Sequence, residues 1–286
     1  MSHVSVIGAG ALGSALIEGL VAAGSDVTVW NRTSEKLDTL SGPQVRAAPS
    51  VQEALAASPL TIVAVSDHDV CRQLIEEAEA DLDDKVVAST SFATAEQAGA
   101  FAEVVAGQGG HCLDLAVAAY PSEVRSRNGW FIVSGDSGVY ERHRHQFDQL
   151  GRTSYVSDTP GSAFISEMAV LLGYFPMAVG LLQGVRVCEQ FGLPQAWFDA
   201  TVSELYPRHI QSLLQRAHAD GDLETGGVEA SIDVWGDAAA EYADALRELG
   251  LDAGMYDALH RLFNAASEAG QGSADWIRIA GHVAGR

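Results

Sequence analysis

The sequence predicts a fold of two parts: an N-terminal α/β region with a doubly wound parallel sheet, and an all-α C-terminal region. Three observations lead to this prediction. Strand-like and helix-like segments alternate up to about residue 150, which is the pattern of successive βαβ units. A glycine-rich turn follows the first of these strands. After Gly161 the strand signals stop, and long helical patterns replace them.

The expected strands are short apolar runs that end in glycine or polar residues. They lie at 4–7, 27–30, 60–65, 85–89, 113–118 and 130–134. A helix is expected from Ala11 to Ala23, and a much longer one from Gly161 to about Phe191, with Pro176 bending it. The chain is thereby divided into an α/β region (1–160), an interdomain helix (161–191) and a helical C-terminal region (192–286).

Composition excludes several classes of protein. The chain has 38 acidic and 17 basic residues among 286, a formal net charge of -21, which disfavours binding to nucleic acid or to anionic membranes. A hydrophobic content of 47% with 19% charged residues is typical of a folded chain. The three cysteines are widely separated, so we expect neither a disulfide framework nor a metal site. We see no secretory signal and expect a cytoplasmic location.

One uncharged stretch, Met168–Val185, reaches the lower length limit of a membrane-spanning helix. It contains Gly173, Pro176 and Gly180, and it is the only such run in the sequence. We therefore expect a buried helix in a soluble core rather than a membrane span.

The glycine-rich turn has the spacing of a dinucleotide-binding motif. It reads Gly8-Ala9-Gly10-Ala11-Leu12-Gly13, which fits G-x-G-x-x-G. In that motif the first glycine makes a tight turn, the second admits the pyrophosphate, and the third lets the helix pack on the strand. The amides at the helix N-terminus then face the phosphates. Because the motif follows a strand and opens a helix, it predicts a Rossmann-type cofactor site.

The end of the second strand indicates which dinucleotide is bound. NAD sites usually carry an acidic residue there, which binds the ribose 2′-hydroxyl. This chain has Asn31 instead, followed by Arg32, Thr33 and Lys36, which are suited to surround a 2′-phosphate. The alternative is an ordinary solvated loop, but the position at a strand end favours NADPH. The stretch Val65-Ser66-Asp67 and the residue Ser91 end two further strands, where Rossmann ligands bind, although such a serine also serves simply as a turn former.

These residues resemble the β-hydroxyacid dehydrogenase and imine reductase superfamily, which is 6-phosphogluconate dehydrogenase-like. Its hydroxyacid branch carries a catalytic lysine on the long helix, and the matching position here is Glu167. The imine reductase branch is more similar along almost the whole chain. Asp114–Pro121 resembles D-G-A-x-M-A-Y-P, 161–171 resembles G-x-A-x-x-Y-D-x-A-L-L, and 270–277 resembles G-x-G-x-x-D-x-x.

The resemblance implies NADPH-dependent reduction of an imine or iminium to an amine. It also implies a homodimer with exchanged domains and an active site between the subunits. Glu167 stands where the branch has aspartate, and we interpret it as the catalytic carboxylate; the alternative is an acid that only suits the start of a helix.

Five aromatic residues are candidates for the substrate pocket. Phe92 replaces a glycine that the family often has, and Tyr120 is the tyrosine of the segment that resembles D-G-A-x-M-A-Y-P. Tyr174 and Phe175 follow Glu167 by about two helical turns, and Trp235 belongs to a stretch that the family takes from the partner subunit. A plain core role is the alternative for Phe175 and Trp235.

Two other functions remain open. One is a reductase of a small carbonyl or hydroxyacid, which the missing lysine disfavours. The other is a cofactor-binding protein without catalysis, because the Tyr-Asp pair of the family is Ser166-Glu167 here.

Overall fold

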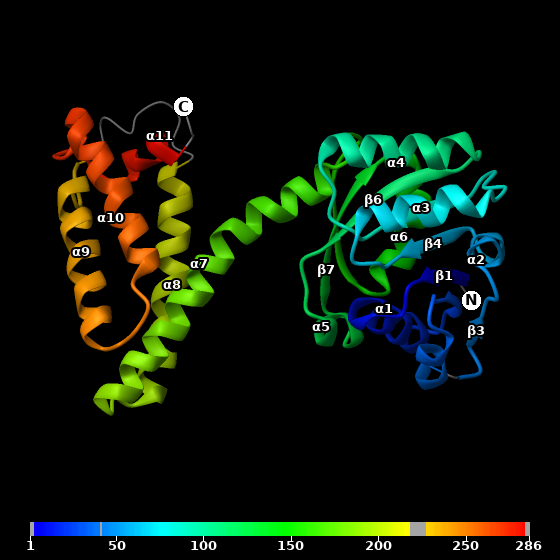
Figure 1. Ribbon diagram of the computed structural model, residues 1–286, viewed down its shortest axis with the longest axis horizontal. Helices are drawn as coiled ribbons and strands as arrows, with labels where there is room; N and C mark the ends of the chain where they lie inside the picture. Colours follow the sequence, from blue (N-terminus) through cyan, green and yellow to red (C-terminus); the bar gives the residue numbers. More distant parts are fainter. Residues whose placement is uncertain (1–2, 41, 218–226, 284–286) are drawn as a thin grey trace. The chain divides into compact units, whose positions relative to one another are not determined.

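The computed structural model describes residues 3–40, 42–217 and 227–283; the remaining parts of the expected regions lie outside the described residues. The chain divides into two compact units, Met1–Leu172 and Gly173–Arg286. The division falls inside α7 (Ser162–Phe191), the long helix that links the α/β part to the helical part (Figure 1). The helix spans almost the range that the sequence predicts.

The N-terminal unit contains, within the described residues, an eight-stranded sheet in the order β3-β2-β1-β4-β5-β6-β7-β8. The strands are β1 (His3–Ile7), β2 (Asp26–Trp30), β3 (Val45–Ala47), β4 (Leu60–Val63), β5 (Val86–Ser89), β6 (His111–Val117), β7 (Gly129–Gly135) and β8 (Gly151–Ser157). The order reverses direction between β1 and β4, which is the switch point of a doubly wound sheet.

The sheet is not parallel throughout, and in this respect the prediction from sequence is wrong. β7 runs antiparallel to β6, and β8 runs parallel to β7. The connection from β6 to β7 holds only the short helix α5 (Pro121–Arg125). A parallel pair needs a crossover connection, usually through a full helix, whereas a short connection returns the chain in the opposite direction.

Two strands have no counterpart in the prediction, and both lie at an edge of the sheet. β3 contains only three residues, and β8 reads GRTSYVS, with polar residues in most positions. An edge strand pairs on one side only and tolerates polar side chains, so it lacks the apolar run that marks a buried strand.

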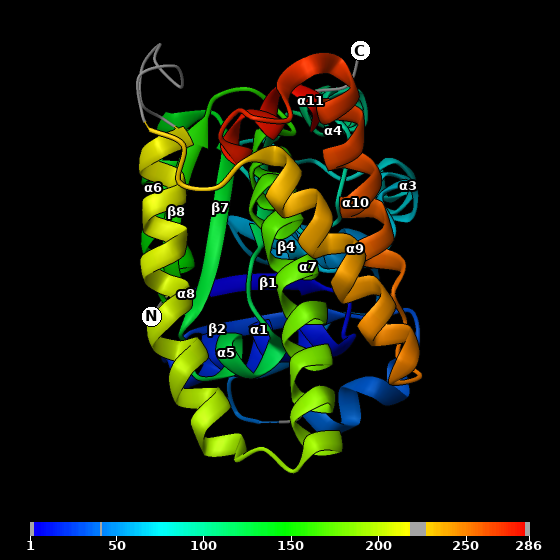
Figure 2. The same ribbon diagram turned by 90° about the vertical axis from the view of Figure 1, so that its left-hand side faces the viewer.

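Helices cover both faces of the sheet. They are α1 (Ala11–Ala22), η1 (Ser34–Leu40), α2 (Val51–Ala57), α3 (His68–Ala78), α4 (Ala95–Gly107) and α6 (Ser137–Asp148), together with α5. Successive strand residues point to opposite faces, so Val6 packs in the core that includes α1 and α6, and Ile7 in the core that includes α2, α3 and α4. α1 and α5 lie side by side in both views (Figures 1 and 2).

The C-terminal unit is helical in its described residues. It contains the second part of α7, then α8 (Gln195–Ala217), α9 (Ile232–Glu248), α10 (Gly254–Ala266), η2 (Ser267–Gln271), η3 (Trp276–Ile279) and α11 (Ala280–Val283). α9 and α10 pack along each other (Figure 2). Ile232, Phe263 and Ala266 are the buried residues of one small core in this unit.

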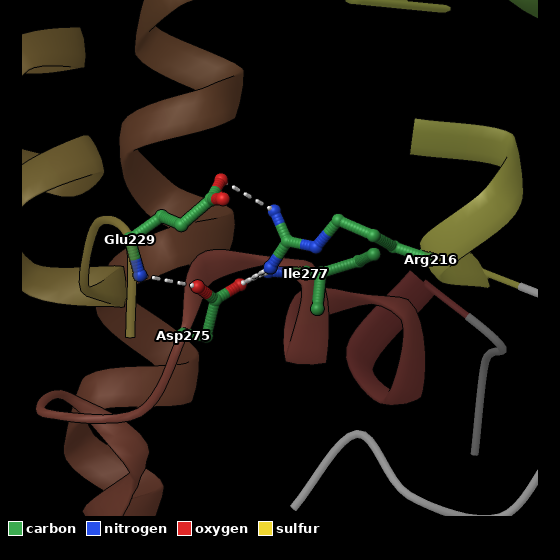
Figure 3. A network of polar contacts seen from close by, with 4 residues as sticks. All are labelled: Arg216, Glu229, Asp275 and Ile277. Atoms are coloured by element: carbon green, nitrogen blue, oxygen red, sulfur yellow. Dashed lines mark hydrogen bonds and ion pairs between the residues drawn. The ribbon is translucent and has the colours of Figure 1, made fainter. Parts of the chain in front are cut away.

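A buried carboxylate, Asp275, connects the segments at the end of this unit (Figure 3). Its Oδ2 accepts from the backbone amide of Glu229 at 3.0 Å, and its Oδ1 accepts from the amide of Ile277 at 3.1 Å. The guanidinium of Arg216, at the end of α8, donates to Oδ1 at 2.5 Å. The aspartate of the G-x-G-x-x-D-like segment therefore joins α8, the start of α9 and η3.

The expectation that Met168–Val185 is buried is wrong for the single chain. Among the described helices, α7 alone is long and apolar enough to cross a membrane, and none of its most apolar stretch is buried. One such helix is weak evidence for a membrane span, because helices of soluble cores have the same composition. Several of its large side chains, including Leu172 and Leu182, are more than 60% exposed.

Candidate functional site

A cavity of about 780 Å³ lies at the carboxyl ends of β1, β2, β4 and β5. It is lined by Gly8, Gly10, Ala11 and Leu12, by Trp30, Asn31 and Arg32, by Ala64, Val65, Ser66 and Asp67, and by Thr90, Ser91 and Phe92. Four residues of α3 complete it: Val70, Gln73, Leu74 and Glu77. Parallel strands bring their carboxyl ends to the same edge, so segments far apart in sequence meet where ligands of doubly wound sheets bind.

The glycine turn packs closely against backbone atoms at Gly8 and Gly13 and is open at Gly10. A Cβ atom at Gly8, whose φ is +103°, would lie 2.4 Å from the carbonyl oxygen of Ala64. A Cβ at Gly13 would lie 2.0 Å from the carbonyl oxygen of Gly8. At Gly10, by contrast, a Cβ would have no atom within 4 Å. Gly8 and Gly13 are therefore required by the fold, whereas Gly10 leaves room for a ligand on the cavity side.

The N-terminus of α1 is suited to an anion. Gly10 is its N-cap residue, no side chain caps the helix, and its first turn contains no acidic residue. The free amides and the positive end of the helix dipole therefore face the cavity. A dinucleotide phosphate fits this combination of open space, unpaired donors and positive potential.

The loop after β2 supports the glycine turn and supplies a cation. The side-chain Oδ1 of Asn31 accepts from the amide of Ala9 at 2.9 Å, and its Nδ2 donates to the carbonyl of Thr33 at 2.7 Å. Arg32 lines the cavity, and among the described residues no carboxylate lies within ion-pair distance of it. Four of the expected cofactor residues do not line the cavity: Ala9, Gly13, Thr33 and Lys36.

The residues after β4 and β5 line the cavity and also hold its wall together. Asp67 is the N-cap of α3, where its Oδ1 accepts from the amide of Val70 at 3.0 Å. The hydroxyl of Ser91 donates to the carbonyl of Val65 at 2.6 Å, so it connects the two strand ends. The turn-forming interpretation of Ser91 and its place in the cavity wall are therefore compatible.

The wall formed by α3 has no counterpart in the sequence analysis. Its four lining residues form two pairs at helical spacing, Val70 with Leu74 and Gln73 with Glu77. The amide of Gln73 donates to the carboxylate of Glu77 at 2.6 Å. The available signal was this i,i+4 spacing on the helix after Asp67, which places two apolar and two polar groups on one face.

Glu167 lies outside the cavity wall, on a helix whose start packs against that wall. Phe92 lines the cavity, and its ring is 6.1 Å from the ring of Phe164, one helical turn before Glu167 on α7. Glu167 is half-buried and has no ion-pair partner among the described residues. Burial raises the pKa of its carboxyl group above the ordinary value.

The other four aromatic candidates do not line this cavity. Tyr120 is the exposed N-cap residue of α5. Tyr174 and Phe175 are exposed on α7, with ring centres 6.1 Å apart. Trp235, on α9, stacks on Trp276 at 4.5 Å and contacts Phe263. Only Phe92, among the five predicted pocket residues, is part of the cavity in the described chain.

The described residues contain no group of three or more His, Cys, Asp or Glu side chains arranged to hold a metal ion. The cavity is lined instead by backbone amides, the cation of Arg32, polar and apolar side chains and the carboxylates of Asp67 and Glu77, and Glu167 lies outside its wall on α7.

The sheet order and the glycine-turn cavity define a dinucleotide-binding protein with a helical second domain. Residues 3–158 match the family described as the NAD binding domain of 6-phosphogluconate dehydrogenase. Residues 159–285 match the family described as the NADPH-dependent reductive aminase-like C-terminal domain. The chain belongs to the family that these two domains define.

Individual relatives agree with this assignment. The NADPH-dependent reductive aminase of Aspergillus oryzae is 24% identical over 246 residues, which cover 82% of this chain and 81% of that protein. The imine reductase of a Pseudomonas species has a TM-score of 0.90 at 25% identity, with 99% of each chain covered. The imine reductase of Myxococcus stipitatus in complex with NADP+ has a TM-score of 0.88 at 26% identity, covering 98% of this chain and 99% of that one.

Proposed function

We propose that this protein is an NADPH-dependent oxidoreductase that reduces the C=N bond of an imine or iminium to an amine. The observation that carries the proposal is the pairing of an anion-binding dinucleotide cavity with a desolvated carboxyl group, Glu167, one helical turn after Phe164, whose ring packs near the cavity residue Phe92. Relatives named as imine reductases and a reductive aminase support the same reaction class.

The residues of the cavity fit NADPH. The uncapped start of α1 and the open face of Gly10 suit the pyrophosphate, and Arg32, without a carboxylate partner among the described residues, suits the 2′-phosphate. NADPH held there supplies a hydride to the carbon of the substrate C=N bond. Asn31 holds the glycine turn in place through the amide of Ala9, and Ser91 joins the strand ends beneath the site.

Glu167 is the group that we assign to the substrate nitrogen. A carboxyl group with a raised pKa holds a proton longer than an exposed one and donates it when a basic nitrogen forms. With an imine, the nitrogen takes the proton of Glu167 as the carbon gains the hydride, and the carboxylate that remains is protonated again from water. An iminium already carries its proton, and the carboxylate of Glu167 then stabilises its positive charge. The alternative is that Glu167 only suits the positive end of the α7 dipole and has no catalytic role. It predicts no loss of turnover when the charge is removed.

The test is Glu167→Gln, assayed by NADPH oxidation with a cyclic imine. We expect turnover to fall by about 100-fold or more, because positioned proton transfer contributes about that factor. The binding constant for NADPH should not change. Glu189→Gln is the matched control, since Glu189 is an exposed glutamate on the same helix, whose ion pair within the described residues is with the exposed Arg186.

Each contrary outcome has a clear meaning. Unchanged imine reduction by Glu167→Gln would remove Glu167 from the mechanism. Oxidation of a 3-hydroxypropionate-type acid with NADP by the unmodified protein, without imine turnover, would assign it to the hydroxyacid branch. Tight NADPH binding without turnover on a broad panel of imines would make it a cofactor-binding protein.

Arg32→Ala tests the choice of cofactor. We expect the Kd for NADPH to rise by about tenfold or more, as for a lost charged hydrogen bond, with little change for NADH. Arg46→Ala is the control, because Arg46 is an exposed arginine on the neighbouring strand and does not line the cavity. Equal weakening of NADPH and NADH would show that Arg32 does not contact the 2′-phosphate.

We also propose that a second copy of the chain covers the exposed apolar side chains of α7, in a homodimer with exchanged domains. Val170, Leu172, Phe175 and Leu182 are each at least 60% exposed, which is unusual for a row of large apolar residues. Tyr120, Tyr174, Phe175 and Trp235 would then be candidates for a cleft shared by two subunits. Light scattering in detergent-free buffer tests this proposal, and a stable monomer contradicts it.

A further inference from the structure

Two buried polar side chains from neighbouring strands bind the first turn of α7. The hydroxyl of Ser134, on β7, accepts from the amide of Ala163 at 2.9 Å and donates to Oδ2 of Asp114 at 2.7 Å. The same Oδ2 accepts from the amide of Gly161 at 2.6 Å. Asp114 is 2% exposed and Ser134 is fully buried, and the two residues are register partners across β6 and β7.

This arrangement differs from ordinary helix capping. The first amides of a helix have no partner within the helix, and a residue at its own start usually satisfies one of them. Here the partners come from the sheet, so the start of α7 is attached to β6 and β7 rather than to a capping side chain at its own N-terminus. The helix cannot shift along or away from the sheet without breaking hydrogen bonds in a buried place.

Packing restricts the same turn from the other side. Gly161 has a φ of +85°, and a Cβ atom there would lie 2.9 Å from Cα of Ala95, the first residue of α4. The next buried residues, Ala163 and Phe164, are both 0% exposed and pack with Ala116 and Ile132 of β6 and β7. The turn is therefore held by hydrogen bonds and by close contact at once.

We propose that Asp114 and Ser134 are positioning residues for Glu167. The inference rests on the proposed function, in which the Glu167 carboxyl group faces the substrate nitrogen. Glu167 follows Ala163 by four residues, so the two lie on the same face of α7, one turn apart. A shift of the anchored turn is passed along the rigid helix to this carboxyl group.

The hydrogen-bond geometry, rather than the charge of Asp114, carries the effect. An asparagine side chain at this position presents one carbonyl oxygen, and a single oxygen already accepts both bonds in the structure. Asp114→Asn therefore keeps the two acceptor contacts while it removes the charge. Ser134→Ala removes both the acceptor for Ala163 and the donor to Asp114.

The experiment compares Ser134→Ala, Asp114→Asn and a control, Ser58→Ala, in the full chain with saturating NADPH. Ser58 is also a buried serine whose hydroxyl donates to a backbone carbonyl, that of Leu60 at 2.7 Å, but it lies away from α7. We expect Ser134→Ala to lower kcat by about 10-fold to 100-fold, the range for a misplacement near 1 Å, with an unchanged Kd for NADPH. Ser58→Ala should keep kcat within about threefold, and Asp114→Asn, which retains the acceptor oxygen, should lose less kcat than Ser134→Ala.

A double-variant cycle separates positioning from general damage. In the Glu167→Gln background, Ser134→Ala should cause no further loss of kcat, because the group to be positioned is already gone. A purely structural role would lower kcat by the same factor in both backgrounds. Should Ser134→Ala not fold, Ser134→Cys keeps nearly the same shape with a weaker acceptor, and its kcat should fall between those of the native protein and Glu167→Gln.

The outcomes also distinguish the positioning role of Asp114 and Ser134 from the proposed catalytic role of Glu167. Unchanged kcat in folded Ser134→Ala or Ser134→Cys, together with a strong loss in Glu167→Gln, overturns the positioning role alone. Full activity in Glu167→Gln overturns the proposed role of Glu167, and with it the basis for any positioning residue. An equal loss in Ser58→Ala would show that any buried serine of this unit has the same effect.

Discussion

Two aspartates with little exposed surface, one in each unit, have pKa values that are shifted in opposite directions. Asp114 accepts from a backbone amide and a hydroxyl, whereas Asp275 accepts from two backbone amides and the guanidinium of Arg216. Burial raises the pKa of Asp114, and its neutral hydrogen-bond donors do not offset that effect. At Asp275 burial acts in the same direction, but the hydrogen bonds from Ile277, Glu229 and Arg216 hold the pKa below the ordinary value.

The two carboxyl groups differ both in how strongly burial acts on them and in the number and kind of their hydrogen-bond donors. Neutral donors satisfy the hydrogen-bonding capacity of a carboxylate, but they only partly replace the water that stabilised its charge. At Asp275 the amides of Ile277 and Glu229 lower the pKa most, and Arg216 adds a charge-assisted hydrogen bond, so that together they favour the ionised form. Asp275 therefore stabilises the helical unit as an ionised group paired with Arg216. Asp114 instead fixes the start of α7 through hydrogen bonds that do not depend on its charge.

Breaking the ion pair of the helical unit should have the largest effect. Asp275→Ala leaves the guanidinium and two amides without their acceptor, so we expect a loss of about 3 kcal/mol in the free energy of unfolding. Urea denaturation measures it. The control is Asp257→Ala, whose partner Arg247 and own side chain are 50% and 36% exposed, and there we expect less than about 1 kcal/mol. Equal losses in the two variants would contradict the special role of Asp275.

The pH dependence of stability sharpens the comparison, with an effect of intermediate size. Because the folded pKa of Asp275 is lowered, its stabilising contribution is present above the unfolded value and is lost as pH falls through the folded pKa. The folded pKa of Asp114 is raised, so its protonated form is favoured on folding, and its contribution decreases as pH rises from the unfolded value.

Asp275→Asn should therefore lose stability at neutral pH and approach the native protein in acid. The melting temperature of Asp114→Asn, relative to that of the native protein, should be highest at neutral pH. It should be lowest near pH 3, where the native carboxyl is also uncharged. Thermal unfolding of both variants from pH 3 to pH 8 measures these slopes. Parallel curves for the two variants would show that the opposite pKa directions have no consequence for folding.

The features that depend on short-range sequence patterns could be predicted from the sequence. The glycine turn, the first strands and the long helix all follow from short-range signals, and the two-part fold, the NADPH cofactor and the reaction class are confirmed. The individual site residues, the domain boundaries and the homodimer stay predictions. The direction of β7 could not be predicted from the local sequence, because this strand has the same apolar pattern whether it pairs parallel or antiparallel with β6.

The contacts that fix α7 were also beyond local reasoning. Asp114 and Ser134 meet because two strands pair in one particular register, and Gly161 reaches them from a different element. Hydrophobic periodicity does not indicate which residue of β6 lies opposite which residue of β7. The α3 wall of the cavity was missed for a related reason, since Gln73 and Glu77 look like an ordinary solvated helix face until β4 directs them to the cofactor cavity.

Removing the half-buried charge of Glu167 should give the smallest change in stability, and a change of the opposite sign to its effect on turnover. Burial raises the folded pKa of this carboxyl above its unfolded value, so ionisation of Glu167 costs more free energy in the folded state than in the unfolded state. Glu167→Gln should therefore unfold at a slightly higher temperature than the native protein at pH 7, and the gain should disappear below pH 4. A stabilised, inactive variant is the expected signature of a site that keeps a poorly solvated group for function rather than for folding. Thermal unfolding that shows a loss at pH 7 would mean that Glu167 has a favourable partner in the native assembly, which would favour the structural interpretation of this residue.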